Sequence, residues 1–291
     1  MSKINNSILM SDANNFSTDC PINPYYHLNH VNREEANNEH GRVRQLLTEA
    51  GVKVTSIPSP AGCQDGIYTA NWALVRGDKA VLSSLPNARK NEEEYAKKIL
   101  TDLGKQVFKI PSGLKFSGQG DALPCGNLLF CGQGYRSDAE AQSFVANILD
   151  YELVQLRTVP QLDSFGKPII NSSTGWCDSY FYDLDMALAI IKGPDSDKKG
   201  LIAYCPEAFQ PESREILKNL DGVEKIEVSI EEAKEAFATN LVSTGETVIM
   251  SNKAPKLANN LQNTGLTVIC PDLTEIAKGG GYIRCITLTL D

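Results

Sequence analysis

The sequence has few histidines and no excess of positive charge. Three of its 291 residues are histidine, and its 28 Lys and Arg are outnumbered by 36 Asp and Glu, which gives a formal net charge of −8. Nucleic acid and anionic membrane attract proteins through basic patches, so neither is expected as a partner. No apolar run approaches the roughly 20 residues that cross a bilayer, and the N-terminus lacks the charged-then-apolar pattern of a secretory signal. These absences predict a cytoplasmic protein.

The eight cysteines also lack a metal-binding pattern. None forms a Cys-x-x-Cys pair, and three histidines offer little to a zinc cluster, so no metal site is expected. In a cytoplasmic protein we expect most cysteines to be reduced and buried. No linker or low-complexity segment divides the chain, and its share of charged residues, 22%, is ordinary for a globular protein. We therefore expect a single domain spanning residues 1–291.

What the sequence does contain is an internal repeat. Four segments consist of an Asp or Asn, an apolar run, a turn and a second apolar run, and they begin at Asn71, Asp121, Asp185 and Asn240. Their turn residues are typical of β-hairpins. A fifth run begins at Cys285, which we place on the last strand, and has no second strand of its own. We expect the N-terminal run Ile8–Met10 to pair with it and close a ring.

A helix and a further strand are predicted after each hairpin. Apolar residues at spacings of three and four predict helices at Arg33–Ala50, Asn91–Leu103, Asp138–Leu149, Pro211–Leu220 and Pro255–Gln262. Strands are predicted at Val52–Ile57, Gln106–Ile110, Glu152–Thr158, Val223–Val228 and Leu266–Cys270. The sequence therefore predicts an α/β protein of five strand–strand–helix–strand units, with about fifteen strands in total.

Polar residues stand at or near the starts of the predicted inner strands. They are Asp65, Asn71, Asp121, Asp185, Asn240 and Cys285. A ring of five units brings equivalent positions together near its axis, so these groups should converge on one cavity, as in a binding site. The alternative is a repeated scaffold that binds other proteins and has no small ligand.

Six short motifs, in order along most of the chain, carry a family resemblance. They are Ile22-Asn-Pro24, Gln64-Asp-Gly-Ile-Tyr-Thr-Ala-Asn71, Phe116-Ser-Gly-Gln-Gly-Asp121, Gly132-Gln-Gly-Tyr-Arg136, Phe181-Tyr-Asp-Leu-Asp185 and Gly279-Gly-Gly-Tyr-Ile-Arg-Cys285. They resemble motifs of the guanidino-group-modifying superfamily, which includes arginine deiminase, dimethylarginine dimethylaminohydrolase, arginine dihydrolase and the amidinotransferases. The resemblance implies a five-bladed, pseudo-symmetric α/β propeller (the pentein fold) of ββαβ units. It also implies a hydrolase or amidinotransferase of arginine metabolism that needs no cofactor.

The resemblance assigns roles to single residues. Cys285 matches the nucleophile, which would attack the guanidino carbon of an arginine-like small molecule and form a covalent intermediate. Asp65 and Asp185 match the positions that hold the guanidinium, a planar cation that needs carboxylates in its plane. Arg136 matches the position that binds the substrate carboxylate. The remaining substrate-binding candidates are Asn71, Asp121 and Asn240.

Each of these residues also has a structural interpretation. Cys285 could be a buried structural thiol, and Asp65 and Asp185 could cap strands or bind backbone groups. Asp121 could organise its glycine-rich turn, and Arg136 could be a surface arginine. These alternatives stay open at the level of sequence.

Two members of the family's Cys–His–Glu triad are replaced. Asp183 stands at the histidine position and Ser117 at the glutamate position. All three histidines lie near the N-terminus, from where a loop could bring His27 or His30 to the site. Either Asp183 takes over proton transfer as a catalytic residue, or the chain is a catalytically lapsed relative that binds an amino acid or guanidino compound without turnover.

Activation of Cys285 is the chemical difficulty. The thiolate is the reactive form, and the carboxylate of Asp183 would oppose it because like charge raises a thiol pKa. Arg284 is adjacent, but strand alternation would turn it to the opposite face. The stabilising cation would then be the substrate itself. The sequence leaves open which guanidino compound is the substrate and whether the reaction is hydrolysis or amidino transfer. It also leaves open whether the protein forms a homo-oligomer.

Overall fold

The computed structural model describes residues 3–26 and 30–291, and in them fifteen strands form five three-stranded sheets. The strands are β1 (Ser7–Ser11), β2 (Lys53–Ile57), β3 (Ala73–Arg76), β4 (Lys79–Leu82), β5 (Gln106–Lys109), β6 (Ala122–Cys125), β7 (Leu128–Gln133), β8 (Glu152–Arg157), β9 (Leu188–Lys192), β10 (Gly200–Tyr204), β11 (Val223–Glu227), β12 (Val242–Ser243), β13 (Thr247–Ile249), β14 (Thr267–Ile269) and β15 (Leu288–Thr289). In each sheet an antiparallel hairpin is followed, after a helix, by a third strand parallel to the middle one. This is the predicted five-unit α/β propeller.

The ring is closed by the two ends of the chain. β1 pairs antiparallel with β15, with Ile8 opposite Thr289 and Leu9 opposite Leu288, and it pairs in parallel with β2. The first sheet therefore has the same ββαβ pattern as the other four, although its first strand comes from the end of the chain. The predicted pairing of the first and last strands is confirmed.

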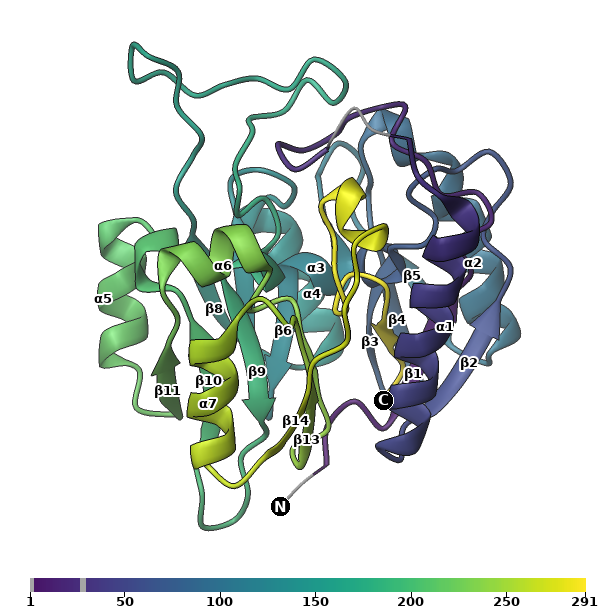
Figure 1. Cartoon of the computed structure of the whole chain (residues 1–291). Helices are drawn as coiled ribbons and strands as arrows, with labels where there is room; N and C mark the ends of the chain where they lie inside the picture. The colour runs from purple at the N-terminus through teal and green to yellow at the C-terminus, as the bar shows by residue number, and fades with distance from the viewer. Residues whose placement is uncertain (1–2, 27–29) are drawn as a thin grey trace.

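Five helices connect the hairpins to their third strands and lie outside the sheets (Figure 1). They are α1 (Arg33–Glu49), α2 (Asn91–Asp102), α4 (Ala139–Leu149), α5 (Pro211–Asn219) and α7 (Pro255–Asn263). Their signals are local: Asn32 caps α1 by accepting the Glu35 N–H at 3.2 Å, and α5 and α7 begin with proline. Predicted and observed ends differ by one residue at most.

Further short helical segments were not predicted. α6 (Ile230–Ala236) begins at Ser229, which accepts the Glu232 N–H at 3.3 Å, and its sequence is too charged to show an apolar stripe. α3 (Gly118–Asp121), η1 (Thr69–Trp72), η3 (Leu184–Met186) and η5 (Ile276–Gly279) are single turns, and the first three stand directly before an inner strand or one residue away from it.

These single turns place the polar side chains at the ring axis. Asn71 lies in η1, Asp121 ends α3 and Asp185 lies in η3, while Asn240 precedes β12 by two residues. The placement of Cys285 on the last strand is wrong. It lies in a helical turn, with Ile286 N–H donating to Tyr282 O at 3.3 Å and Thr287 N–H to Arg284 O at 3.0 Å, and β15 begins three residues later.

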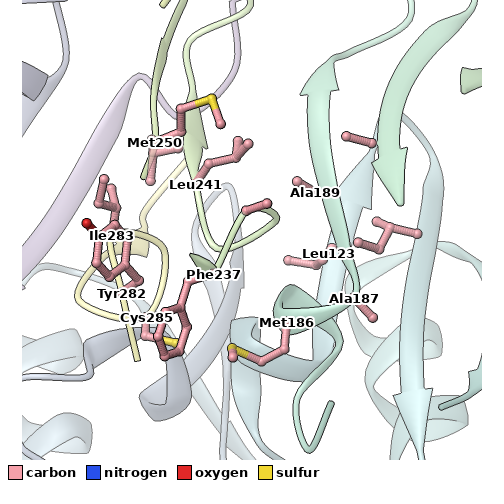
Figure 2. Close-up of a cluster of buried hydrophobic side chains, with 14 of the residues drawn as sticks. Leu123, Met186, Ala187, Ala189, Phe237, Leu241, Met250, Tyr282, Ile283 and Cys285 are labelled. Carbon is pink, nitrogen blue, oxygen red and sulfur yellow. The ribbon is translucent and has the colours of Figure 1, made fainter. Parts of the chain in front are cut away.

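The core surrounds this turn. Figure 2 shows Cys285 and Met186 beside Phe237 and Tyr282, whose rings stack at 5.6 Å. Each large apolar side chain buried in this way contributes roughly 1.5–3 kcal/mol. Among residues 3–26 and 30–291, no helix combines the length and apolar character that a bilayer crossing requires.

Candidate active site

Cys285 is held in place by one amide side chain. Asn240 Oδ1 accepts the backbone N–H groups of Tyr282 and Cys285, both at 3.1 Å, and its Nδ2 donates to Cys285 Sγ at 3.0 Å. The thiol in turn donates to Asp185 Oδ2 at 3.4 Å. Cys285 is 2% exposed and Asp185 is fully buried. The structure therefore brings together the predicted nucleophile, one predicted guanidinium-binding carboxylate and Asn240, which was predicted to bind substrate and here supports the Cys285 turn.

The glycine run before Cys285 allows close packing. Gly280 has a φ of +82°, in the left-handed region that favours glycine. A Cβ on Gly281 would lie 2.5 Å from the Tyr68 ring and 2.8 Å from Cys285 Cβ. The Tyr68 hydroxyl donates to Ile276 O at 2.7 Å, which fixes the ring. The loop before Cys285 can therefore pass the Tyr68 ring only because its glycines have no side chain.

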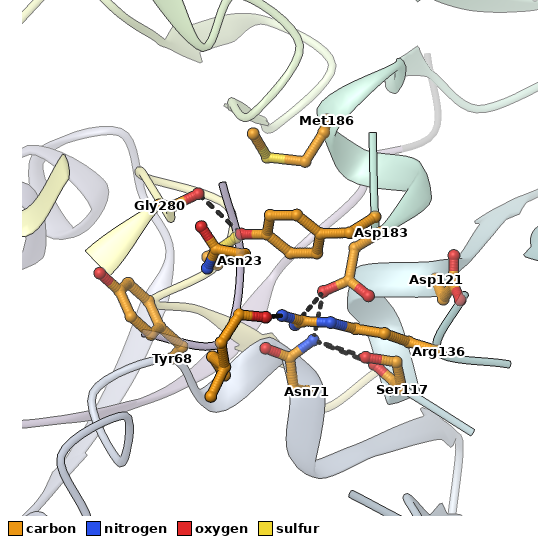
Figure 3. A network of polar contacts seen from close by, with 12 residues as sticks. Asn23, Tyr68, Asn71, Ser117, Asp121, Arg136, Asp183, Met186 and Gly280 are labelled. Atoms are coloured by element: carbon orange, nitrogen blue, oxygen red, sulfur yellow. Dashed lines mark hydrogen bonds and ion pairs between the residues drawn. The ribbon is translucent and has the colours of Figure 1, made fainter. Parts of the chain in front are cut away.

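A second group of polar side chains surrounds Asp183 (Figure 3). Asp183 Oδ2 accepts from Asn71 Nδ2 at 2.8 Å and lies 3.4 Å from Arg136 Nη1, and Asn71 Nδ2 also donates to Ser117 Oγ at 3.0 Å. The Arg136 guanidinium lies over the Tyr182 ring at 4.0 Å. Asp183 and Ser117, the two replacements in the triad, therefore both accept from the same nitrogen of Asn71. Arg136 is buried, so it is not a surface arginine.

Asp65 lies in a separate group. It is 1% exposed, its Oδ1 accepts the Tyr26 hydroxyl, and its Oδ2 accepts from Gln64 Nε2 at 3.1 Å. Within the described ranges, no hydrogen bond or ion pair joins Asp65 to Cys285 or Asp185. Burial raises the pKa of Tyr68 most, and the charges of Asp65 and Cys285 raise it further. Tyr68 therefore lies within electrostatic range of both residues.

Sequence reasoning missed the ion pair between Arg89 and Glu92. Arg89 Nη2 lies 2.6 Å from Glu92 Oε2 and Arg89 Nε lies 2.8 Å from Oε1, with both side chains almost fully buried. Arg89 Nη1 also donates to Asn71 Oδ1 at 2.8 Å, which directs the Asn71 amide group toward Asp183. A pair three residues apart normally lies on the surface of a helix, so the sequence offered no signal of this burial.

Asp121 binds backbone rather than the Cys285 group. Its Oδ1 accepts the Leu184 N–H at 3.0 Å, which ties α3 to the segment that carries Asp183 and Asp185. This contact supports the interpretation of Asp121 as an organiser of its turn.

The centre is rich in buried acids. Burial, with the nearby charges of Asp185 and Asp183, raises the pKa of Cys285 well above its usual range. Burial and Asp183 likewise raise the pKa of both Asp185 and Asp121. The free thiol is therefore protonated at neutral pH, and a cationic ligand would be electrostatically favoured.

The described histidines contact none of these groups through a hydrogen bond. His40 is buried in α1, where burial lowers its pKa to about 4. His30 is exposed, and His27 lies outside the described residues. Asp183 therefore has no histidine among its bonded neighbours in residues 3–26 and 30–291.

A cavity of about 170 Å³ is lined by residues near both ends of the described chain, Lys3 and Asp291 among them. We call it the rear cavity. It is lined by Lys3, Gln119, Asp185, Thr239, Arg284 and Asp291, among others, and Cys285 is not one of its lining residues. Arg284 lies in the turn before Cys285 and not on a strand, and its guanidinium donates to Gln119 Oε1 at 2.9 Å and Thr289 Oγ1 at 3.0 Å.

Comparison with curated proteins places this site in a known family. A family model described as N,N dimethylarginine dimethylhydrolase, eukaryotic, matches residues 10–290. The chain is 31% identical over 286 residues to the bifunctional arginine dihydrolase/ornithine cyclodeaminase AgrE of a Nostoc species, which covers 96% of this chain and 37% of AgrE. It is 28% identical to the N(G),N(G)-dimethylarginine dimethylaminohydrolase of Mycobacterium tuberculosis over 94% of this chain and 82% of that protein. The chain thus spans a little over a third of the length of AgrE.

Solved structures agree. One is the N-terminal domain of ArgZ, an arginine dihydrolase, bound to product. It matches with a TM-score of 0.84 at 29% identity, and the match covers 98% of this chain and 97% of the ArgZ domain. A dimethylarginine dimethylaminohydrolase structure at 20% identity, with a TM-score of 0.73, supports the fold alone. The chain therefore belongs to the dimethylarginine dimethylhydrolase family, within the guanidino-group-modifying superfamily of pentein fold.

Proposed function

We propose that the protein is a hydrolase that acts on the guanidino group of an arginine-like small molecule through a covalent intermediate on Cys285. The observation that carries this proposal is the placement of Cys285 Sγ, which receives a hydrogen bond from Asn240 and faces Asp185 in a buried, acid-rich centre. A planar cation beside Asp185 would offset the repulsion among these acids and orient its central carbon toward the sulfur.

The proposed chemistry has two steps. The Cys285 thiolate attacks the guanidino carbon, and the carbon–nitrogen bond to the leaving amine breaks as that nitrogen gains a proton. Water then attacks the same carbon, the sulfur–carbon bond breaks, and the thiol is restored. Asp183 is the proposed proton carrier, because it stands at the histidine position and its Oδ1 has no hydrogen-bond partner among the described residues.

Arg136 has to exchange partners in this scheme. It is paired with Asp183 at 3.4 Å, and we propose that the carboxylate of an incoming amino-acid substrate takes the place of Asp183. This exchange would release Asp183 for proton transfer only when a substrate with a carboxylate is bound. Asp65 is proposed as the second carboxylate for the cationic end of the ligand, released from Tyr26 on binding.

The second candidate function is ligand binding without turnover. It is favoured by the replacement of the family histidine and glutamate by Asp183 and Ser117, and by the pairing of Asp183 with Arg136. Single-domain organisation, a cytoplasmic location and action without a cofactor stay predictions.

The test is incubation with arginine, methylarginines, agmatine and citrulline, followed by mass detection of products. Release of ammonia or a methylamine by the protein, absent in Cys285→Ser, would support the hydrolase. Calorimetry tests the role of the Asp65 carboxylate: Asp65→Asn should lose binding of the guanidino compound. Ser117→Ala is the control and should bind normally. Binding of a guanidino compound with no product would favour the lapsed relative, and neither binding nor product would refute both.

A further inference from the structure

Arg284 is a buried cation without a contacting carboxylate. It is 7% exposed, and the bonds of its guanidinium go to the neutral oxygens of Gln119, Thr289 and Asn5. In residues 3–26 and 30–291 no Asp or Glu oxygen lies within 4.0 Å of it. A buried charge is costly unless other charges or water compensate it, so the compensation has to come from the rear cavity and the groups around it.

The rear cavity contains polar atoms that need partners. Asp185 Oδ1 and Thr239 Oγ1 are buried and form no hydrogen bond in the described structure, and both residues line the cavity together with Arg284. A volume of about 170 Å³ exceeds the roughly 30 Å³ that one water occupies in the liquid several times over. Water in this cavity would satisfy both oxygens and connect the Arg284 guanidinium to the Asp185 carboxylate.

The other two buried arginines near the centre are already engaged. Arg136 is paired with Asp183, and Arg89 forms two bonds to Glu92. Among the described residues, the titratable groups that interact most strongly with Cys285 or Asp185 are Asp121, Asp183, Tyr68, Tyr182 and Arg284, and Asp291 interacts with Arg284. Of this set, Arg284 alone is positive and has no carboxylate in contact.

We propose that Arg284 is the resident cation of the nucleophile, and that from the rear cavity it stabilises the negative charges of Asp185 and of the Cys285 thiolate. It would act through Asp185 and cavity water, as a positioning residue, while the substrate approaches Cys285 from elsewhere. The contribution of Arg284 to catalysis rests on the proposed function, but its effect on the pKa of the Cys285 thiol exists in the free protein. The expectation that the substrate is the sole cation for the thiolate would then be incomplete.

The direction of the effect follows from charge. The charge of Asp185 raises the pKa of the Cys285 thiol and so opposes the loss of its proton, while burial opposes the loss of the Asp185 proton. A cation near both favours each loss, and Asp185 already interacts with Arg284 in the sense that lowers its pKa. Removal of the cation therefore raises the pKa of the step that forms the thiolate.

The experiment is the pH profile of Cys285 alkylation by iodoacetamide in the free protein, with the Cys285 peptide quantified by mass spectrometry. In Arg284→Met we expect the midpoint to rise by about one pH unit, which makes alkylation about tenfold slower below the midpoint. Arg284→Lys keeps the charge and should restore most of the rate. Lys3→Met is the matched control: it removes a charge at the same cavity from a side chain that is 59% exposed, where solvent screens it, and should leave the profile unchanged.

A second variant protects the test against misfolding. Gln119→Glu places a carboxylate at the atom that now accepts from Arg284 at 2.9 Å, so it neutralises the cation without removing it and should also raise the midpoint. Thermal melting shows which of Arg284→Met and Gln119→Glu are folded. If the folded variants keep the midpoint of the parent protein, the proposal is overturned. Alkylation needs no turnover, so a shifted profile together with a failed substrate panel would refute the proposed function and leave the role of Arg284 standing.

Discussion

Arg89→Met should destabilise the protein strongly, because it leaves the buried Glu92 carboxylate without its cation. Arg89 forms two bonds to Glu92, one to Asn71 Oδ1 and two to the carbonyls of Asp65 and Tyr68. Breaking a buried pair by removing one partner costs about 4 kcal/mol. For 291 residues the entropy of unfolding near the melting temperature is about 0.6 kcal/mol per kelvin, so Tm should fall by about 7 °C.

The assay is calorimetric melting of the variant beside two comparisons. Arg42→Met removes an exposed arginine of α1 that forms one long bond to Gln45, and it should change stability by no more than about 0.5 kcal/mol. The double variant Arg89→Met with Glu92→Leu removes both charges and should recover much of the loss. A Tm within about 2 °C of the parent in Arg89→Met would refute the reasoning.

The remaining predictions concern the triad replacements, the glycine run and pH. Asp183→His with Ser117→Glu restores the family residues; if the natural protein is a lapsed relative, turnover should appear in the double variant and in neither single variant, and equal turnover in the parent would contradict that reading. Gly281→Ala places a methyl group against the fixed Tyr68 ring and should lower stability by about 1–3 kcal/mol, with Gly41→Ala, whose added Cβ would meet no atom within 4 Å, measured for comparison by denaturant titration; equal losses would argue against the packing explanation. His40 has a pKa of about 4 when folded against 6.5 ordinarily, so between these values the unfolded chain binds a proton that the folded chain does not, and acidification should remove about 3 kcal/mol. That part of the pH dependence should be absent in His40→Leu, and an identical slope in both proteins would show that other groups cause it.

Much of the fold was predictable because its signals are local. The five long helices and the strands after them follow from apolar spacing, caps and prolines, and the repeat of Asp or Asn before an apolar run located the residues near the axis. Ring closure by Ile8–Met10 followed from counting: the last unit lacked a strand and the N-terminus had one to spare.

The site was less predictable because its contacts join distant segments. Arg136 and Asp183 are 47 residues apart, and no local pattern shows that they pair. The Arg89–Glu92 pair resembles a surface helical pair in sequence, and only burial makes it structural. The strand placement of Cys285 failed because its apolar run reads as a strand, whereas the hydrogen bonds of the turn from Tyr282 to Thr287 hold that residue outside β15.

The closure of the ring by β1 and β15 also sets the order in which the protein can be built. During synthesis Ile8 is made before the other four sheets and its partner Thr289 after them, so the first sheet stays incomplete until all four have been made. Cys285 belongs to the same late segment, so its interactions with Asn240, Asp185 and Tyr68 can form only after that segment has been made. Four units can form their hairpins locally, but the reaction centre requires a contact of very high sequence separation, which is slow to form. The nascent chain would therefore carry no assembled nucleophile, and reactivity at Cys285 would begin only when β1 and β15 pair.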